Sequence, residues 1–371
     1  MSDLRKKVLN PGLPPMGLRP AAAKVPVHKK RNYSPIPWSE YFDERKIVNT
    51  RGGRFCTYRK GSSGPLLVCL HGGGFSALTW ALFSKELVEE VECRVLAIDQ
   101  RGHGDTETDD DADLSIETLS TDVGAIIGEL YPDPPPLVLM GHSMGGAVAV
   151  HASQPHILPS QIALLVLDVV EGSAMEALSG MRSFLRGRPP KFKSLEHAIE
   201  WSVRTGQIKN SESARVSMGG QVKPCSGSRA HSFSMHTSDP IAEEEPSDAG
   251  ESSSPVQSSG ETNVDNSCPH EWRVDLEQTE QYWSGWFQGL SARFLDVAVP
   301  KVLILAGIDR LDKDLAVGQM QGKFQMNVVG KVGHAVHEDA PDKVADVVAT
   351  FLVRNKFTEP LENFHRQFPS C

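Results

Sequence analysis

The sequence predicts a doubly wound α/β fold, in which a mostly parallel sheet lies between layers of helices. Short, continuously apolar runs recur along the chain, as expected of strands that are buried on both faces. Segments with helical periodicity alternate with these runs, which is the chain order of a parallel sheet. The chain has 371 residues, 39% of them hydrophobic, which is enough for a large core.

Six apolar runs are expected to form the buried strands of this sheet. They are "LLVCL" (66–70), "RVLAI" (94–98), "PLVLM" (136–140), "IALLVL" (162–167), "KVLILA" (301–306) and "QMNVV" (325–329). The alternating piece "RGGRFCTYRK" (51–60) is typical of an antiparallel hairpin at the sheet edge. The segment "SIETLSTDVGAIIGEL" (115–130) predicts a helix with Ser115 as its N-cap.

Two later segments have helical periodicity but do not fit the alternation of strands and helices. "SAMEALSGMRSFLRGRP" and "EQYWSGWFQGLSARF" each place their apolar side chains on one face, namely Met175, Leu178, Met181 and Leu185, and Trp283, Trp286, Phe287, Leu290 and Phe294. The simpler interpretation makes these residues core. A second interpretation, compatible with the first, is a helical lid at about 170–296, inserted between the later strands and covering the strand ends.

Composition divides the chain into one folded domain and two segments that are expected to be disordered. Residues 1–35 carry eight Lys or Arg and several prolines, which indicates a basic arm. Residues 224–271 are acidic and rich in Ser, which indicates a disordered insertion within the lid. The range 36–371 is expected to form a single domain.

Charge and cysteine usage limit the expected compartment and partners. The formal net charge of −9 argues against general binding to nucleic acid or to an anionic membrane surface. The six cysteines include no CxxC pair, which favours a reducing compartment. No apolar run approaches the ~20 residues of a membrane span, and the N-terminus lacks a signal-peptide core. We expect a cytoplasmic protein, with "HKKR" (28–31) as a weak signal for the nucleus as well.

The stretch "PPPLVLMGHSMGGAVAV" (134–150) predicts a nucleophilic serine. An apolar strand leads into Gly-His-Ser-Met-Gly and then into a helix, which is the context that G-x-S-x-G requires. Gly141 and Gly145 allow close backbone approach around Ser143, whose strained turn would project Oγ above the sheet. The alternative is a purely structural glycine-rich turn, which this context disfavours.

A second glycine-rich motif predicts an oxyanion hole. The sequence "HGGG" (71–74) directly follows the first buried strand, as it does in lipases and esterases. The expected donors are the amides of Met144, Gly73 and Gly74. A phosphate-binding loop is the alternative, but neither G-x-x-x-x-G-K-[ST] nor G-x-G-x-x-G follows.

The remaining members of a serine-hydrolase triad are expected after later strands. His334 follows the last predicted strand and is the expected base, whereas His337 is expected to pack nearby. The pattern H-x-x-H-E at 334–338 is not a zinc motif, so no metal is expected. Asp168 and Asp309 each follow a strand, and spacing alone does not choose between them as the acid.

The chain resembles the protein phosphatase methylesterase family over nearly all of residues 33–371. The segments that carry the resemblance are "YSPIPWSEYF", "HGGGFSALTW", "GHSMGGAVAVH", "LDVVEGSAMEAL", "FLRGRPPKFKSLEHAIEWSV", "SESARVSM", "TEQYWSGWFQGLS", "LILAGIDRLDKDLAVGQMQGKFQM" and "GHAVHEDAPDKVA". "RGHGDT" and "ASQPHILPS" depart from the expected spelling, but neither contains a triad position.

The resemblance implies a fold, an activity and a partner. The fold is that of α/β-hydrolases, and the activity is a serine carboxylesterase that demethylates the C-terminal leucine of the type 2A protein phosphatase catalytic subunit. The family's acid lies in the "DVVEG" element, so the resemblance implies Asp168 rather than Asp309. It implies no cofactor.

Two other functions stay open on the sequence. One is a general carboxylesterase or lipase that acts on small esters. The other is an α/β-hydrolase scaffold that binds the phosphatase and whose catalysis is secondary.

Overall fold

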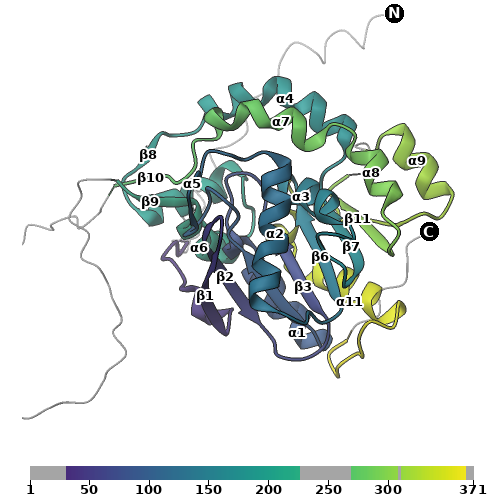
Figure 1. The fold of residues 1–371 in the computed structure, drawn as a ribbon. Helices are drawn as coiled ribbons and strands as arrows, with labels where there is room; N and C mark the ends of the chain where they lie inside the picture. Colours follow the sequence, from purple (N-terminus) through teal and green to yellow (C-terminus); the bar gives the residue numbers. More distant parts are fainter. Residues whose placement is uncertain (1–30, 226–268, 308–310, 365–371) are drawn as a thin grey trace, which may run out of the picture. The chain divides into compact units, whose positions relative to one another are not determined.

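The computed structural model describes residues 31–225, 269–307 and 311–364, whose arrangement is shown in Figure 1. Most of the expected basic arm and of the expected acidic insertion lies outside the described residues, and so does Asp309.

The main sheet is mostly parallel and has nine strands in the described part of the chain. Its order is β1-β2-β4-β3-β6-β7-β11-β12, with the short β5 paired to β2. The strand β2 pairs antiparallel with β1 and β4, and the strands from β4 to β12 pair in parallel. The bounds are β1 Glu44–Thr50, β2 Gly53–Lys60, β3 Leu66–Leu70, β4 Arg94–Ile98, β5 Glu107–Thr108, β6 Leu137–His142, β7 Gln161–Leu167, β11 Lys301–Leu305 and β12 Gln325–Val328.

The two faces of this sheet carry two separate hydrophobic cores. Alternate side chains of β3 show the division: Leu66, Val68 and Leu70 belong to one core, and Leu67 and Cys69 belong to the other. The first core also holds side chains of α2 (Ile116–Leu130), α3 (Met144–Ala152) and α8 (Leu290–Asp296). The second holds side chains of α1 (Ala81–Glu90) and α11 (Pro341–Arg354). Burial on both faces explains why these strands read as continuous apolar runs.

Most predicted elements are confirmed to within a residue or two, including the helix α2. The antiparallel hairpin expected at 51–60 is longer: β1 lies entirely before this range, which supplies only the turn and β2. Ser115 does precede α2, but its hydroxyl donates to Thr118 Oγ1 at 3.0 Å instead of capping a helix amide. The Thr118 hydroxyl in turn donates to Asp113 Oδ2 at 2.7 Å. The turn before α2 is therefore closed by these side chains together with the Ser115 amide, which donates to Asp113 Oδ1 at 3.1 Å.

The chain between β7 and β11 forms helices and a small second sheet. The helices are α4 Glu171–Arg186, α5 Leu195–Thr205, α6 Ser211–Gln221, η3 Leu276–Thr279, α7 Glu280–Phe287 and α8. The strands β8 (Lys191–Phe192), β10 (His270–Trp272) and β9 (Val222–Pro224) pair antiparallel around their own apolar cluster, which includes Phe192. Figure 1 shows α4 and α7 running beside each other.

Two expectations for this region need correction. Met175 of α4, which was expected in the core, is 37% exposed. The aromatic segment that begins at Glu280 is two helices, α7 and α8, and not one. Gly289 stands between them with φ +74°, a left-handed conformation that ends helical continuity. The predicted apolar residues of both helices are nevertheless buried in the first core.

The remaining helices lie in the connections between the elements already described. They are η1 Trp38–Glu40, η2 Ala77–Trp80, α9 Lys313–Met320 and α10 Val336–Asp339. None of the helices in the described ranges combines the length and the apolar character needed to cross a membrane.

Candidate active site

Ser143 occupies a strained turn between β6 and α3. Its φ of 54° and ψ of −120° are rare for a residue with a side chain. Three backbone hydrogen bonds hold it: its amide donates to Leu167, and its carbonyl accepts from Gly146 at 2.9 Å and from Ala147 at 3.2 Å. The geometry is that of a strand-to-helix nucleophile turn.

Both glycines of the G-x-S-x-G motif are required, because neighbouring backbone atoms leave no room for a Cβ at either position. A Cβ at Gly141 would lie 2.0 Å from the carbonyl oxygen of Gly145, inside any allowed contact. A Cβ at Gly145 would lie 2.3 Å from the carbonyl oxygen of Leu70. These two positions let α3 begin directly against β6 and β3, which sets the direction of Ser143.

Asp168 and His334 are joined by a hydrogen bond. His334 Nδ1 donates to Asp168 Oδ2 at 2.8 Å, and Asp168 Oδ1 accepts from the amide of Ala306 at 2.9 Å. The Asp168 side chain is fully buried at the end of β7, whereas the His334 side chain is 48% exposed. Because Nδ1 carries the donated proton, Nε2 of the neutral ring is left as an acceptor.

The loop that carries His334 is held from both sides. The His334 carbonyl accepts from His142 Nε2 at 2.8 Å and from the amide of Val336 at 3.0 Å. One residue earlier, the Gly333 amide donates to Asp339 Oδ2 at 2.5 Å. Asp339 also accepts from the amide of Lys209, just before α6, at 2.7 Å. The imidazole therefore stands on a loop fixed to β6 and to the region before α6.

His142 and His337 are buried, and their rings pack in a row with that of His334. The ring of His142 lies 4.6 Å from each of the rings of His334 and His337, centroid to centroid. His337 stacks on Trp80 with centroids 4.1 Å apart. Burial, with the neighbouring histidines adding to it, holds the pKa of His142 well below its usual range and lowers that of His337 to about 3. Both rings are neutral and contribute shape and hydrogen bonds rather than charge.

The "HGGG" loop follows β3, but its glycine amides are not equivalent. The amide of Gly74 donates to His103 Nε2 at 2.9 Å, so it is already engaged. This argues against Gly74 as an oxyanion donor. Gly73 lies against the side chain of Met144, since a Cβ there would be 3.8 Å from the Met144 sulfur. Gly73 and Met144 remain the candidate donors.

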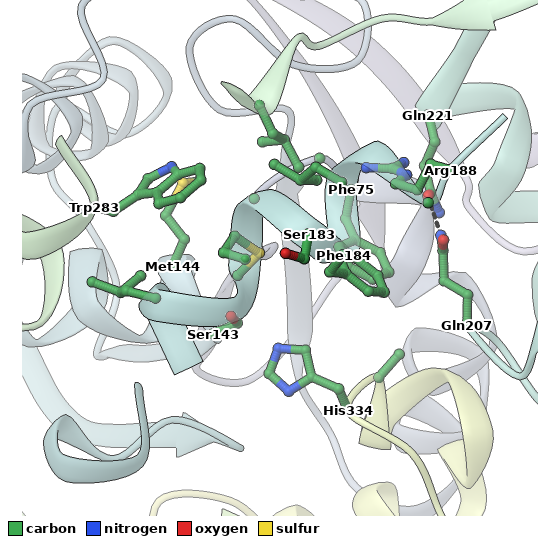
Figure 2. A pocket seen from close by; sticks show the side chains of 18 of the residues that line it. Phe75, Ser143, Met144, Ser183, Phe184, Arg188, Gln207, Gln221, Trp283 and His334 are labelled. Carbon is green, nitrogen blue, oxygen red and sulfur yellow. Dashed lines mark hydrogen bonds between the residues drawn. The ribbon is translucent and has the colours of Figure 1, made fainter. Parts of the chain in front are cut away.

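Ser143 and His334 line a cavity of about 600 Å³ together with Gly73 and Met144. Figure 2 shows the Ser143 and His334 side chains at this cavity, with Phe184 and Trp283 around it. The apolar lining comes mainly from α4, η3 and α7, and comprises Leu178, Met181, Phe184, Leu185, Leu276, Trp283, Trp286 and Phe287. Such a cavity suits an apolar acyl group next to a reacting ester.

Sequence reasoning missed the residues that position the loops. His103 and Gln100 hold the "HGGG" loop: Gln100 Nε2 donates to the His71 carbonyl at 2.6 Å, and the Gln100 amide donates to His71 Nε2 at 3.0 Å. The available signal was "DQRGHGD" (99–105), which directly follows β4 at the same edge of the sheet. The sequence also indicated no structural role for His142, which occupies a variable position of the G-x-S-x-G motif.

A model of the alpha/beta hydrolase family matches residues 67–347. Protein phosphatase methylesterase 1 of Homo sapiens is 51% identical over 370 residues, covering 97% of this chain and 96% of that relative. The Bos taurus relative of the same name is 52% identical over 363 residues, covering 95% of this chain and 96% of that protein. The chain belongs to the protein phosphatase methylesterase family. The family resemblance found in the sequence is thereby confirmed.

A more distant relative agrees with the methylesterase family assignment, and two solved structures agree with the fold. Probable protein phosphatase methylesterase 1 of Caenorhabditis elegans is 45% identical over 361 residues, covering 97% of this chain and 87% of that relative. The solved structure of E-2-(acetamidomethylene)succinate hydrolase has a TM-score of 0.60 at 17% identity, covering 84% of this chain and 99% of that chain. The solved structure of a Mycobacterium tuberculosis esterase has a TM-score of 0.57 at 22% identity, covering 84% of this chain and 92% of that chain. The two structures support the fold alone, and the predicted α/β-hydrolase fold is confirmed.

Proposed function

We propose that this α/β-hydrolase is a serine carboxylesterase with Ser143 as nucleophile, His334 as base and Asp168 as acid. Its proposed substrate is the methyl ester on the C-terminal leucine of the type 2A protein phosphatase catalytic subunit. The family assignment supports methylester hydrolysis on a protein phosphatase. The apolar cavity at Ser143 supports a leucine as the acyl residue.

The proposed reaction begins with proton transfer. His334 Nε2 takes the proton of Ser143 Oγ, and Oγ attacks the ester carbonyl carbon. The oxyanion that forms accepts hydrogen bonds from the amides of Gly73 and Met144. The carbonyl re-forms, the bond to the methoxy oxygen breaks, and methanol leaves with the proton from His334. Asp168 stabilises the imidazolium during both transfers.

Water completes the cycle. His334 removes a proton from a water molecule, whose oxygen attacks the acyl carbon of the Ser143 ester. Oγ leaves with the proton returned by His334, and the product is a free leucine carboxylate. Each turnover therefore removes a methyl group as methanol and leaves a negative charge on the partner's C-terminus. The mechanism uses no metal and no cofactor.

The region of about 170–296 is proposed to act as a lid within a single domain of residues 36–371. Support comes from α4, η3 and α7, which lie between β7 and β11 in the chain and line the cavity at Ser143. An apolar lid excludes water and strengthens the polar interactions that it covers.

The hydrogen bond between Asp168 and His334, at the same cavity as the strained Ser143, carries the proposal. The test is methanol release from a carboxymethylated phosphatase catalytic subunit and from its isolated methylated C-terminal peptide. Ser143→Ala is the matched control. We expect release by the unaltered chain and loss of about 10⁴-fold or more in Ser143→Ala. Equal turnover by the variant would exclude this nucleophile.

The same assay separates the two rival functions. A general carboxylesterase or lipase would hydrolyse small p-nitrophenyl esters as well as the methylated tail, without preference for the tail. A phosphatase-binding scaffold would bind the phosphatase but release little methanol. Labelling by a fluorophosphonate, lost in Ser143→Ala, reports whether the serine is activated at all.

We propose the cytoplasm as the location, with the nucleus as a second one. The net charge of −9 supports a partner other than nucleic acid or an anionic membrane surface. The basic "HKKR" (28–31) supports the nuclear location and lies almost entirely outside the described residues. Fluorescence microscopy of the tagged chain, with and without this tetrapeptide, tests both locations.

A further inference from the structure

The cavity at Ser143 contains a guanidinium that the proposed mechanism does not use. Arg188 follows α4 after Gly187, and its side chain lines the same cavity as Ser143 and His334. In Figure 2 Arg188 lies near Gln221, on the opposite side of the view from Ser143. A charged group inside a mostly apolar cavity requires an explanation, because its burial is unfavourable without a counter-charge.

The guanidinium is held in a fixed orientation. Its Cζ lies 3.4 Å from the centroid of the Trp272 ring, which is stacking distance. Trp272 is itself fixed, because its Nε1 donates to the carbonyl of Pro189 at 2.8 Å. The ring also packs edge-on against Phe192, with centroids 5.3 Å apart. The cation is therefore positioned before any ligand arrives, which lowers the entropic cost of binding one.

The end of the cavity near Arg188 offers donors without acceptors. Within the described ranges, Arg188 Nε is buried and has no hydrogen-bond partner, and the same holds for Gln221 Nε2. The Gln221 carbonyl oxygen already accepts from Gln207 Nε2 at 3.1 Å. Among the described residues, no carboxylate lies within ion-pairing distance of Arg188. Burial lowers the pKa of Arg188 only to about 10, so the group is charged at neutral pH.

We propose that Arg188 and Gln221 form a carboxylate subsite, which receives an acidic side chain of the substrate upstream of the esterified leucine. This inference rests on the proposed function, since it takes the ester at Ser143 as the fixed end of a peptide. A carboxylate is the group that supplies the counter-charge which the Arg188 guanidinium lacks, and the planar guanidinium is suited to binding it. The peptide advances about 3.3–3.6 Å per residue, so only one or two positions can place an acidic side chain at Arg188.

The first experiment uses synthetic peptides that end in leucine methyl ester. Each peptide carries a single Asp at one of the four positions before the leucine, and is paired with the same peptide carrying Asn. The measured quantity is the ratio of kcat/KM for methanol release, Asp over Asn. We expect a ratio of about tenfold or more at one position and near one elsewhere. A ratio near one at every position overturns the subsite.

Substitutions of Arg188 then test whether this residue causes the preference for Asp. In Arg188→Met the ratio at the preferred position is expected to fall toward one, and Arg188→Lys is expected to keep only part of it, because it lacks the planar fork. Arg186→Met is the matched control: Arg186 is an exposed arginine at the last position of α4, two residues before Arg188, and the variant should retain the full ratio. A full ratio in Arg188→Met assigns the preference elsewhere and overturns the proposal.

The two proposals fail in different ways. If no leucine methyl ester is hydrolysed in any peptide, the proposed function fails. If all are hydrolysed without an Asp preference, only the subsite fails. The measurement on the unaltered chain decides the subsite even where Arg188→Met does not fold, and thermal unfolding of each variant identifies that case.

Discussion

His142 donates a hydrogen bond from Nε2 to the backbone carbonyl of His334 across 2.8 Å. The two residues are 192 positions apart, yet the residue before the candidate nucleophile holds the loop that carries the candidate base. The ring of His142 is fully buried, and a Cβ at Gly72 would lie 2.9 Å from its Nδ1. The position of His334 relative to Ser143 thus depends on a side chain with no chemical step of its own.

Removing this hydrogen bond should reduce turnover without removing the triad. In His142→Ala we expect kcat for methyl ester hydrolysis to fall by roughly ten- to a hundredfold with little change in KM, because His334 is displaced. His142→Gln, whose amide can still donate, should recover part of the loss. Steady-state kinetics and the rate of fluorophosphonate labelling should fall together. A rise in KM at unchanged kcat would show that His142 acts on substrate binding instead.

Asp168→Asn should be severe although it preserves shape. The amide can still accept from Ala306, but it cannot stabilise the imidazolium that forms on His334. We expect kcat to fall by about 10⁴-fold with the midpoint of thermal unfolding nearly unchanged. Asp309→Asn, measured in parallel, should stay within a few fold of the unaltered chain. The reverse pattern would assign the acid to Asp309.

The glycine at position 145 should tolerate no side chain. Gly145→Ala places a methyl group 2.3 Å from the Leu70 carbonyl oxygen, so α3 must move away from β3. We expect a loss of about 3 kcal/mol in the free energy of unfolding, measured by chemical denaturation. Gly180→Ala is the matched control: it is an exposed helical position with no neighbouring atom within 4 Å of a new Cβ. The free energy of unfolding of Gly180→Ala should rise by up to about 1 kcal/mol. Similar effects of the two substitutions would contradict this packing argument.

Glu338 should make stability depend on pH. Its carboxyl accepts from Thr79 at 2.5 Å, from Ser213 at 2.6 Å and from Ser217 at 2.7 Å, yet burial outweighs these bonds and raises its pKa from 4.5 to about 7. The folded chain therefore holds this proton more tightly than the unfolded chain. The resulting stabilisation is complete below pH 4.5 and is lost as the pH rises through about 7.

The comparison that tests this is with Glu338→Gln. The free energy of unfolding of Glu338→Gln should lack the pH dependence that Glu338 contributes to the unaltered chain. The difference between the two curves should change by on the order of 3 kcal/mol between pH 4.5 and 7. Chemical denaturation across this range measures it, and the subtraction removes other groups such as Glu90. Parallel curves would mean that Glu338 titrates at its ordinary pKa.

Local patterns were sufficient for most of the strands and for the serine turn. The strand β3 reads "LLVCL" because both of its faces are buried, and that environment leaves a continuous apolar run. The Ser143 turn was predictable because its glycines form a local motif, G-x-S-x-G, although only the Gly141 contact is local and Gly145 is required by the distant Leu70 carbonyl. The break at Gly289 between α7 and α8 was missed, since helical periodicity continues across it.

Pairings between distant segments could be decided only by the tertiary structure. Asp168 and Asp309 are equivalent by their positions after a strand, and the resemblance alone favoured Asp168. The structure adds the 2.8 Å contact of Asp168 with His334, whereas Asp309 lies outside the described residues. Residue spacing likewise does not reveal that the Gly74 amide donates to His103, or that Arg188 Nε lacks a hydrogen-bond partner among the described residues. The amino-acid sequence by itself determined which elements form and which residue types could react. The directions of side chains and the partners of buried polar groups depend on contacts between residues far apart in the chain, so they follow only from the folded packing.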